Sequence, residues 1–175
     1  MAVYSILIET YPNAAALARA DEEALRQLLR PLGLYAKRAT QLRGLGEALS
    51  SNDLSLLEDP EVAERTLPGI GAYGARAIAC FAFGRSVGIV DANVIRIFDR
   101  VFAHPKVDPR SRRYQTYADR VARYSPDAKA SNYGLLDIGS AICVRTPKCS
   151  KCPLNNDCRY AKGEKQRFRR HRPTR

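Results

Sequence analysis

Apolar residues recur at helical spacing along most of the chain, and no stretch alternates apolar and polar residues over a useful length. Residues 2–11 have the pattern of the end of an apolar helix that Pro12 stops. Further helices are predicted over residues 21–32, 35–49, 72–83, 92–102, 111–124 and 131–143, and residues 61–66 form a shorter lead-in segment. The pattern therefore predicts an all-α protein.

The stretch Leu67-Pro68-Gly69-Ile70-Gly71 interrupts this helical pattern. A proline and two glycines in five residues break a helix, so we expect a tight hairpin that opens the helix after it. Glycines allow close approach of the backbone to a ligand, and a helix start offers unpaired N–H groups to an anion. We expect the backbone N–H groups of Gly69, Ile70, Gly71 and Ala72 to bind phosphate without reading base sequence.

A second feature is the aspartate that follows the short apolar run at residues 87–90. Asp91 stands directly before the amphipathic segment 92–102, in the position of a helix N-cap. Such a cap stabilises a helix by about 1 kcal/mol. A structural role as a cap is compatible with a second role as a rigidly held carboxylate.

The composition is that of a globular protein, with 175 residues of which 45% are hydrophobic and 27% charged. This length suits one domain or two small lobes. No apolar run is long enough to span a bilayer, and no basic segment precedes the apolar N-terminus. We expect a cytoplasmic protein with no signal peptide and no membrane partner.

The net charge of +11 is unevenly distributed along the chain. Residues 1–60 carry six Lys/Arg against eight Asp/Glu, whereas residues 61–175 carry 23 against 10. Excess positive charge beside the hairpin favours a polyanionic partner such as nucleic acid, and a solvated basic surface is the alternative. The end of the chain, from Lys162, is expected to be disordered alone and to contact phosphate when bound.

Four of the five cysteines lie within sixteen residues, in the spacing Cys143-x5-Cys149-x2-Cys152-x5-Cys158. Four thiolates on one loop in a reducing compartment indicate a metal site rather than disulfides. They could hold a [4Fe–4S] cluster or a tetrahedral zinc ion, although zinc sites favour two C-x-x-C pairs and only one is present. Cys80, within an apolar helix, is predicted to be a core residue.

The hairpin sequence LPGIG at 67–71 and the sequence VDANVIRIFDRV, which begins at Val90 about twenty residues later, together resemble the helix-hairpin-helix DNA glycosylases. This is the superfamily of endonuclease III and of the adenine and mismatch-specific thymine glycosylases. The family hairpin is L-P-G-[VI]-G, and the family aspartate at the position of Asp91 is catalytic. The family cysteine pattern C-x6-C-x2-C-x5-C holds a [4Fe–4S] cluster, and the first loop here is one residue shorter. The resemblance implies that Arg145 and Lys148 in this loop reach DNA phosphate, and Lys151 is a further candidate.

The resemblance implies a two-lobed helix-hairpin-helix DNA glycosylase fold with a C-terminal [4Fe–4S] cluster loop. Residues 1–86 would form a helical bundle lobe with the hairpin at 67–71, and residues 87–160 the second lobe with the cluster loop at 143–158, followed by a basic tail at 161–175. Family members have about 50 more N-terminal residues, which supply a central helix, a wedge glutamine and sometimes a catalytic glutamate.

The implied reaction is hydrolysis of the N-glycosidic bond of a mispaired or damaged base in double-stranded DNA by a monomeric enzyme. In this reading the Asp91 carboxylate stabilises the oxocarbenium-like sugar and orients or deprotonates the attacking water. Tyr73 replaces the lysine of bifunctional relatives, so strand cleavage is not expected, although Tyr73 could simply pack at a helix start. The expected substrate is thymine or uracil opposite guanine. The alternatives are adenine opposite guanine or 8-oxoguanine, and a truncated, inactive DNA-binding module.

Overall fold

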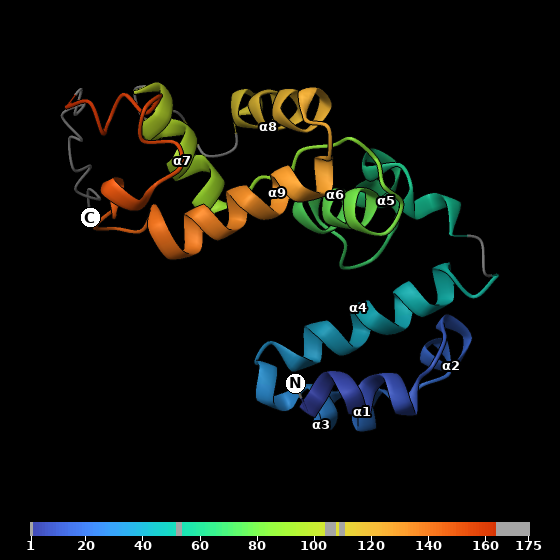
Figure 1. Ribbon diagram of the computed structural model, residues 1–175. Coiled ribbons are helices and arrows are strands. Elements are labelled where there is room, and N and C mark those ends of the chain that lie inside the picture. The colour runs from blue at the N-terminus through green and yellow to red at the C-terminus, as the bar shows by residue number, and fades with distance from the viewer. Residues whose placement is uncertain (1, 52–53, 104–107, 109–110, 164–175) are drawn as a thin grey trace. The chain divides into compact units, whose positions relative to one another are not determined.

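A computed structural model describes residues 2–51, 54–103, 108 and 111–163, and every regular element in that part of the chain is helical (Figure 1). The prediction of an all-α protein is confirmed. The longer helices are α1 (Ala2–Thr10), α2 (Ala14–Ala18), α3 (Glu22–Leu29), α4 (Tyr35–Ala48), α5 (Pro60–Thr66), α6 (Ala72–Phe81), α7 (Ala92–Phe102), α8 (Arg112–Tyr124) and α9 (Ala128–Asp137). Within the described residues, no helix is both long and apolar enough to cross a membrane.

Short polar residues set most of the helix starts, as the capping rules require. Asn13, Asp21, Asp59, Ser111 and Asp127 each accept hydrogen bonds from backbone N–H groups in the first turn of the helix that follows. The Asn13 cap explains α2, a short helix that the apolar pattern did not predict. The Asp127 cap explains why α9 begins at Ala128 rather than at 131, and its last turn continues as a π-helix over Ile138–Ile142.

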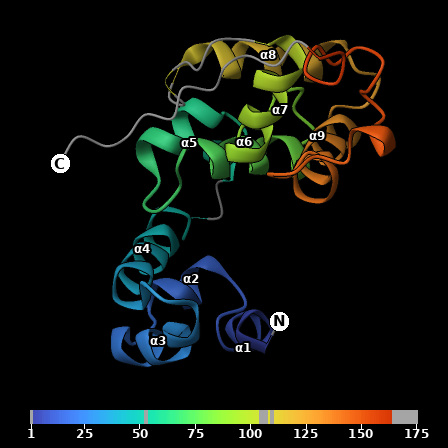
Figure 2. The ribbon, with the colours of Figure 1, turned by 90° about the vertical axis from the view of Figure 1, so that its left-hand side faces the viewer.

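The chain divides into two compact units, Met1–Ala79 and Cys80–Arg175. In the first unit α2 and α3 pack on α4, as both views show (Figures 1 and 2). Leu25, Leu29 and Ala39 form one buried cluster. A second cluster, which includes Leu67 and Ala75, lies beneath the hairpin.

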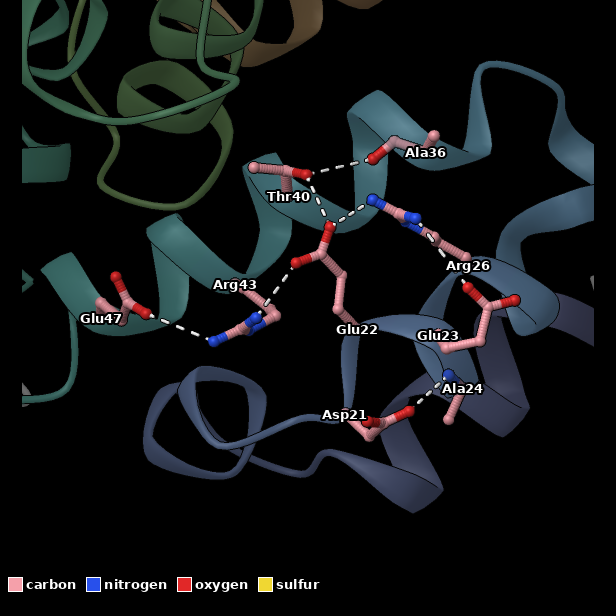
Figure 3. Close-up of polar contacts among 9 residues, drawn as sticks. All are labelled: Asp21, Glu22, Glu23, Ala24, Arg26, Ala36, Thr40, Arg43 and Glu47. Carbon is pink, nitrogen blue, oxygen red and sulfur yellow. Dashed lines mark hydrogen bonds and ion pairs between the residues drawn. The ribbon is translucent and has the colours of Figure 1, made fainter.

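Charged side chains add a second connection between α3 and α4 (Figure 3). The Glu22 carboxylate accepts hydrogen bonds from Arg26 Nη2 at 2.6 Å, Thr40 Oγ1 at 3.1 Å and Arg43 Nη1 at 3.2 Å. The Thr40 hydrogen bond, followed by the two arginines, lowers the pKa of Glu22 below its ordinary value. Arg43 also pairs with Glu47 on the next turn of α4.

In the second unit α7, α8 and α9 pack around the buried side chains of Val94, Phe98, Tyr114 and Ala118. The apolar run before Asp91, residues 87–90, is neither helix nor strand. Side chains satisfy the backbone hydrogen-bonding groups of this run. Asn132, which is 2% exposed, accepts from Ile89 N at 2.9 Å and donates to Val87 O at 3.0 Å.

Two residues of α8 complete this arrangement. Asp119 Oδ1 accepts from Gly88 N at 2.9 Å, and Gln115 Nε2 donates to Gly88 O at 2.9 Å. A Cβ atom at Gly88 would lie 2.1 Å from the Ala118 carbonyl carbon, so only glycine permits this approach. This segment, which we call the strap (residues 87–90), is therefore held by side chains at each of its first three residues.

Candidate functional site

The predicted hairpin is present between α5 and α6. Leu67 anchors it in the core, and Gly69 makes the turn with φ of +79°, in the left-handed region that favours glycine. Ile70 N donates to Leu67 O at 3.3 Å, so this N–H closes the turn. The N–H groups of Gly71 and Ala72 have no partner among the described residues, which leaves them for an anion at the start of α6.

The two hairpin glycines differ in what surrounds them. A Cβ at Gly69 would lie 2.9 Å from Gln41 Cβ of α4, which holds the hairpin against that helix. A Cβ at Gly71 would meet nothing within 4 Å, so the space above Gly71 is open. Tyr73, in the first turn of α6, is 48% exposed and therefore stands at this open surface rather than in the core.

Asp91 caps α7, as its position in the sequence predicts. Its Oδ1 accepts from Asn93 N at 2.9 Å and Val94 N at 2.8 Å, and its Oδ2 accepts from Asn93 Nδ2 at 2.8 Å. The side chain is half-buried. The carboxylate is therefore fixed in direction by three donors, and Oδ2 keeps one lone pair for a water molecule or a substrate atom.

The Asp91 contacts continue along α7 to the cysteine loop. Asn93 Oδ1 accepts from Arg96 Nη2 at 2.6 Å, and the same guanidinium donates to Gly139 O at 2.7 Å and Cys143 O at 2.6 Å. The Asp91 carboxylate is thus connected through Asn93 and Arg96 to the backbone carbonyl of Cys143, the first cysteine of the loop.

The four clustered cysteines line a single cavity together with Arg100 and Pro147. Cys143 and Cys158 are buried, Cys149 and Cys152 are half-buried, and all four are free thiols. Within the described part of the chain, no three potential ligands are grouped closely enough to hold a single metal ion. Each cysteine of a [4Fe–4S] cluster binds a different iron, so cluster ligands lie further apart than those of one ion. Four thiols around one cavity fit a cluster on this ground.

The predicted phosphate contacts of the loop are all exposed. Arg145, Lys148 and Lys151 have exposed side chains. Lys148 Nζ donates to Ala141 O at 3.1 Å, so part of its hydrogen-bonding capacity serves the π-helix end. Arg145 and Lys151 project from the same loop as the cysteines. The part of the basic tail from residue 164 onward lies outside the described residues.

The structure assigns the site residues to both units. The hairpin and Tyr73 belong to the first unit, and Asp91, the cysteine loop and its cations belong to the second. Sequence reasoning missed Asn93, Arg96 and Arg100. The sequence places Arg96 and Arg100 on one face of the helix after Asp91, four residues apart, but it does not show what that face contacts.

Three comparisons bear on this geometry. The family described as "HhH-GPD superfamily base excision DNA repair protein" matches residues 1–123. A thymine-DNA glycosylase of Aeropyrum pernix is 36% identical over 166 residues, which are 90% of this chain and 73% of the relative. An adenine DNA glycosylase of Mycolicibacterium smegmatis is 36% identical over 162 residues, which are 90% of this chain and 54% of the relative. The solved structure of a thermostable thymine-DNA glycosylase superposes with a TM-score of 0.82 at 26% identity, covering 93% of this chain and 76% of that one. The chain therefore belongs to the HhH-GPD superfamily of base excision DNA repair proteins.

Proposed function

We propose that this protein is a monofunctional DNA N-glycosylase that removes thymine or uracil opposite guanine from double-stranded DNA. Family membership and the relatives named DNA glycosylases support the reaction class. The relative named thymine-DNA glycosylase, together with one from Pyrobaculum aerophilum named thymine/uracil-DNA glycosylase at 34% identity, supports the choice of base. The observation that carries the proposal is the fixed, half-buried Asp91 carboxylate at the start of α7.

The Asp91 carboxylate suits the chemistry of glycosidic bond hydrolysis. As the base leaves, positive charge develops on the sugar ring, and a carboxylate directed at it stabilises that charge. Oδ1 is occupied by two backbone N–H groups, so Oδ2 is the atom that meets the sugar or the attacking water. A water hydrogen-bonded to Oδ2 would lose its proton to the carboxylate as it attacks C1′.

Tyr73 supports the absence of strand cleavage. β-Elimination at an abasic site needs an amine that forms a Schiff base with the sugar aldehyde, and a phenol cannot supply one. Tyr73 is exposed in the first turn of α6, and an exposed side chain at the position of the lysine of bifunctional relatives supports this proposal. Base release without strand nicking follows.

The proposed partner is a DNA duplex bound by a single copy of the protein. The Gly71 and Ala72 N–H groups would contact one phosphate, and Arg145, Lys148 and Lys151 would contact others. Because none of these donors reads a base edge, they position the protein without choosing a sequence. A target base must leave the stack before Asp91 can act on its sugar.

The proposed cofactor is a [4Fe–4S] cluster held by Cys143, Cys149, Cys152 and Cys158. The donor set and the shared cavity fit this group, as described above. When bound, the cluster supplies four iron–sulfur bonds that tie the loop together. The loop's cations are thereby held in place for contact with DNA.

A second candidate substrate is adenine opposite guanine or 8-oxoguanine. The observation in its favour is the 36% identity to the adenine DNA glycosylase of Mycolicibacterium smegmatis, which equals the identity to the thymine enzyme. This chain covers 54% of that adenine glycosylase and 73% of the thymine glycosylase.

The test is single-turnover cleavage on duplexes that differ only in the central pair: T·G, U·G, A·G and A·8-oxoguanine. Each product is split into two samples, with and without alkali. We expect strand breaks on T·G and U·G duplexes only after alkali. Breaks without alkali would overturn the monofunctional assignment, and activity confined to the adenine pairs would overturn the choice of base. Tyr73→Lys should introduce some nicking at abasic sites without alkali.

A further inference from the structure

Arg100, in the last turn of α7, directs its guanidinium at the first part of the cysteine loop. Nη1 donates to Val144 O at 2.7 Å and to Cys143 O at 3.1 Å, and Nη2 donates to Arg145 O at 3.2 Å. Three successive carbonyl groups thus converge on one planar cation. The path of the loop from 143 to 145 is set by this side chain, because each carbonyl must face it.

The same residue also contacts the end of the loop. Tyr160 N donates to Arg100 O at 3.1 Å, and the guanidinium carbon lies 5.2 Å from the centre of the Tyr160 ring. Arg159 N donates to the neighbouring Val101 O at 3.1 Å. The C-terminal turn of α7 therefore holds both the first and the last cysteine segments, which are far apart along the loop.

The Arg100 guanidinium also has a direct electrostatic relation to a cysteine. Nη1 lies 3.2 Å from Cys143 Sγ, and Cys143 is 8% exposed. A cysteine binds iron as a thiolate, and burying that anion is costly unless a cation or hydrogen bond compensates it. Hydrogen bonds to cluster sulfurs, together with nearby charge, set the reduction potential of an iron–sulfur centre. A cation at this sulfur disfavours the more positively charged, oxidised cluster and so raises its potential.

We propose that Arg100 is a positioning residue with two effects: it holds residues 143–145 so that Arg145 is presented to DNA, and it raises the reduction potential of the cluster bound through Cys143. The second effect rests on the proposed cofactor. The presentation of Arg145 to DNA rests on the proposed function, whereas the hold on the backbone of residues 143–145 rests on neither proposal, because the three carbonyl contacts involve only the chain's own atoms.

The experiment compares Arg100→Gln, which removes the charge, with Arg100→Lys, which keeps the charge but lacks the planar guanidinium that contacts three carbonyl groups at once. Arg123→Gln is the matched control, since it removes an exposed arginine of α8 from the same unit. Each purified protein is measured for iron content, for cluster reduction potential by electrochemistry on DNA-free protein, and for amide hydrogen exchange over residues 143–148.

For Arg100→Gln we expect a potential shifted to more negative values and exchange at least about tenfold faster over residues 143–148. For Arg100→Lys we expect a potential nearer to that of the wild type but the same loss of exchange protection, and for Arg123→Gln no change in either. An unchanged potential and unchanged exchange in Arg100→Gln would overturn the proposal.

Two failures are separable from that outcome. If Arg100→Gln does not take up iron, Arg100→Lys decides. A potential like that of the wild type together with faster exchange over residues 143–148 supports the proposal, and unchanged exchange over these residues in Arg100→Lys contradicts it. If the wild-type protein itself holds no iron, the proposed cofactor and with it the electrochemical effect are rejected. The exchange comparison then decides the effect of Arg100 on the loop by itself.

Discussion

The side-chain amide of Asn93 donates from Nδ2 to the Oδ2 atom of Asp91 across 2.8 Å, on the one carboxylate oxygen that the backbone of α7 does not use. Arg96 in turn donates to Asn93 Oδ1 at 2.6 Å and fixes the orientation of the amide. The Oδ2 atom of Asp91 is therefore held in direction by the side chain of Asn93, and that side chain is itself held by Arg96.

Replacing Asn93 with alanine should slow base release while leaving DNA binding intact. Without the amide the carboxylate can rotate about its cap, and a misplacement of about 1 Å at a reacting group costs roughly 10²-fold in rate. Single-turnover rates on a T·G duplex and the Kd for an uncleavable analogue would be measured together. Asn156→Ala, at an exposed position of the cysteine loop, is the control and should match the wild type. Equal rates in Asn93→Ala and wild type would show that the backbone cap alone aims Asp91.

Asp91→Asn should abolish base release and leave stability within about 1 kcal/mol, because asparagine is itself a good N-cap. Binding to the duplex should be unchanged or tighter, since a negative charge near the DNA is removed. Asp127→Asn makes the same change at the cap of α9 in the same unit and should keep full activity. The abasic-site yield after alkali is the measurement. An undiminished abasic-site yield in Asp91→Asn would show that Asp91 serves as a helix cap and is not needed for base release.

The hairpin makes a clean substitution possible at Gly71. A Cβ there meets no protein atom within 4 Å, so Gly71→Ala should fold normally and obstruct only what approaches from outside. We expect about a tenfold or larger loss of affinity for duplexes of any sequence, because the phosphate can no longer reach the N–H groups closely. Gly134→Ala, whose Cβ also meets nothing within 4 Å, is the control.

Fluorescence anisotropy at several salt concentrations gives the Kd, which should rise steeply with salt in the wild type. Salt-independent binding would argue against phosphate contact.

The proposed [4Fe–4S] cluster predicts the iron content of the purified protein. Purified anaerobically, the protein should be brown and hold about four iron atoms per chain. Cys149→Ser should lose iron and expose the loop to proteolysis, because the ligand bonds help to fold it. Cys80→Ser, at a cysteine buried outside the loop, should keep the full iron content. One zinc ion per chain with no iron would contradict the proposed cluster and indicate a zinc site instead.

The contact of Glu22 with Thr40, Arg26 and Arg43 predicts a pH dependence of stability. Because this arrangement lowers the pKa of Glu22 in the folded chain, its stabilising effect is complete above the ordinary value of 4.5 and is lost as the pH falls through the lower folded-state value. Wild type should therefore exceed Glu22→Gln in free energy of unfolding at pH 7, and the difference should shrink toward pH 4. Glu64→Gln, at an exposed position of α5, should show no such difference. Urea denaturation at each pH is the measurement, and a constant difference would contradict the assignment.

Local signals in the sequence were sufficient for the helical fold, for the hairpin and for the cap before α7. The break at Pro68 and Gly69 predicted the hairpin, and the position of Asp91 before an amphipathic segment predicted its role as a cap, both of which the structure confirms. The burial of Cys80 is confirmed as well. These features depend on residues adjacent in the chain, where propensity and capping act directly.

Contacts between distant residues could not be predicted in the same way. Arg96 and Arg100 look like ordinary exposed cations of an amphipathic helix, and only the folded chain brings them to Gly139 and Cys143. Likewise Asn132 lies in an unremarkable helical pattern, 43 residues from its partner Ile89. Such pairs depend on how α7, α8 and α9 pack, which periodicity alone does not determine.

The strap at residues 87–90 has a consequence for how this protein can vary. A strand in a sheet can slip along its neighbour, whereas the strap is held by individual side chains. Asn132 bonds to Val87 and Ile89, and Ala118 of α8 lies so close to Gly88 that no side chain fits there. Losing or gaining one residue here would shift the chain by one residue, about 3.8 Å between Cα atoms, and would break its match with Asn132 and Asp119. Asp91 would leave its place even though its sequence motif remained intact. Length changes in homologous enzymes should therefore be absent between Val87 and Asp91, and an engineered one-residue deletion there should cost activity that no point mutation in α7 restores.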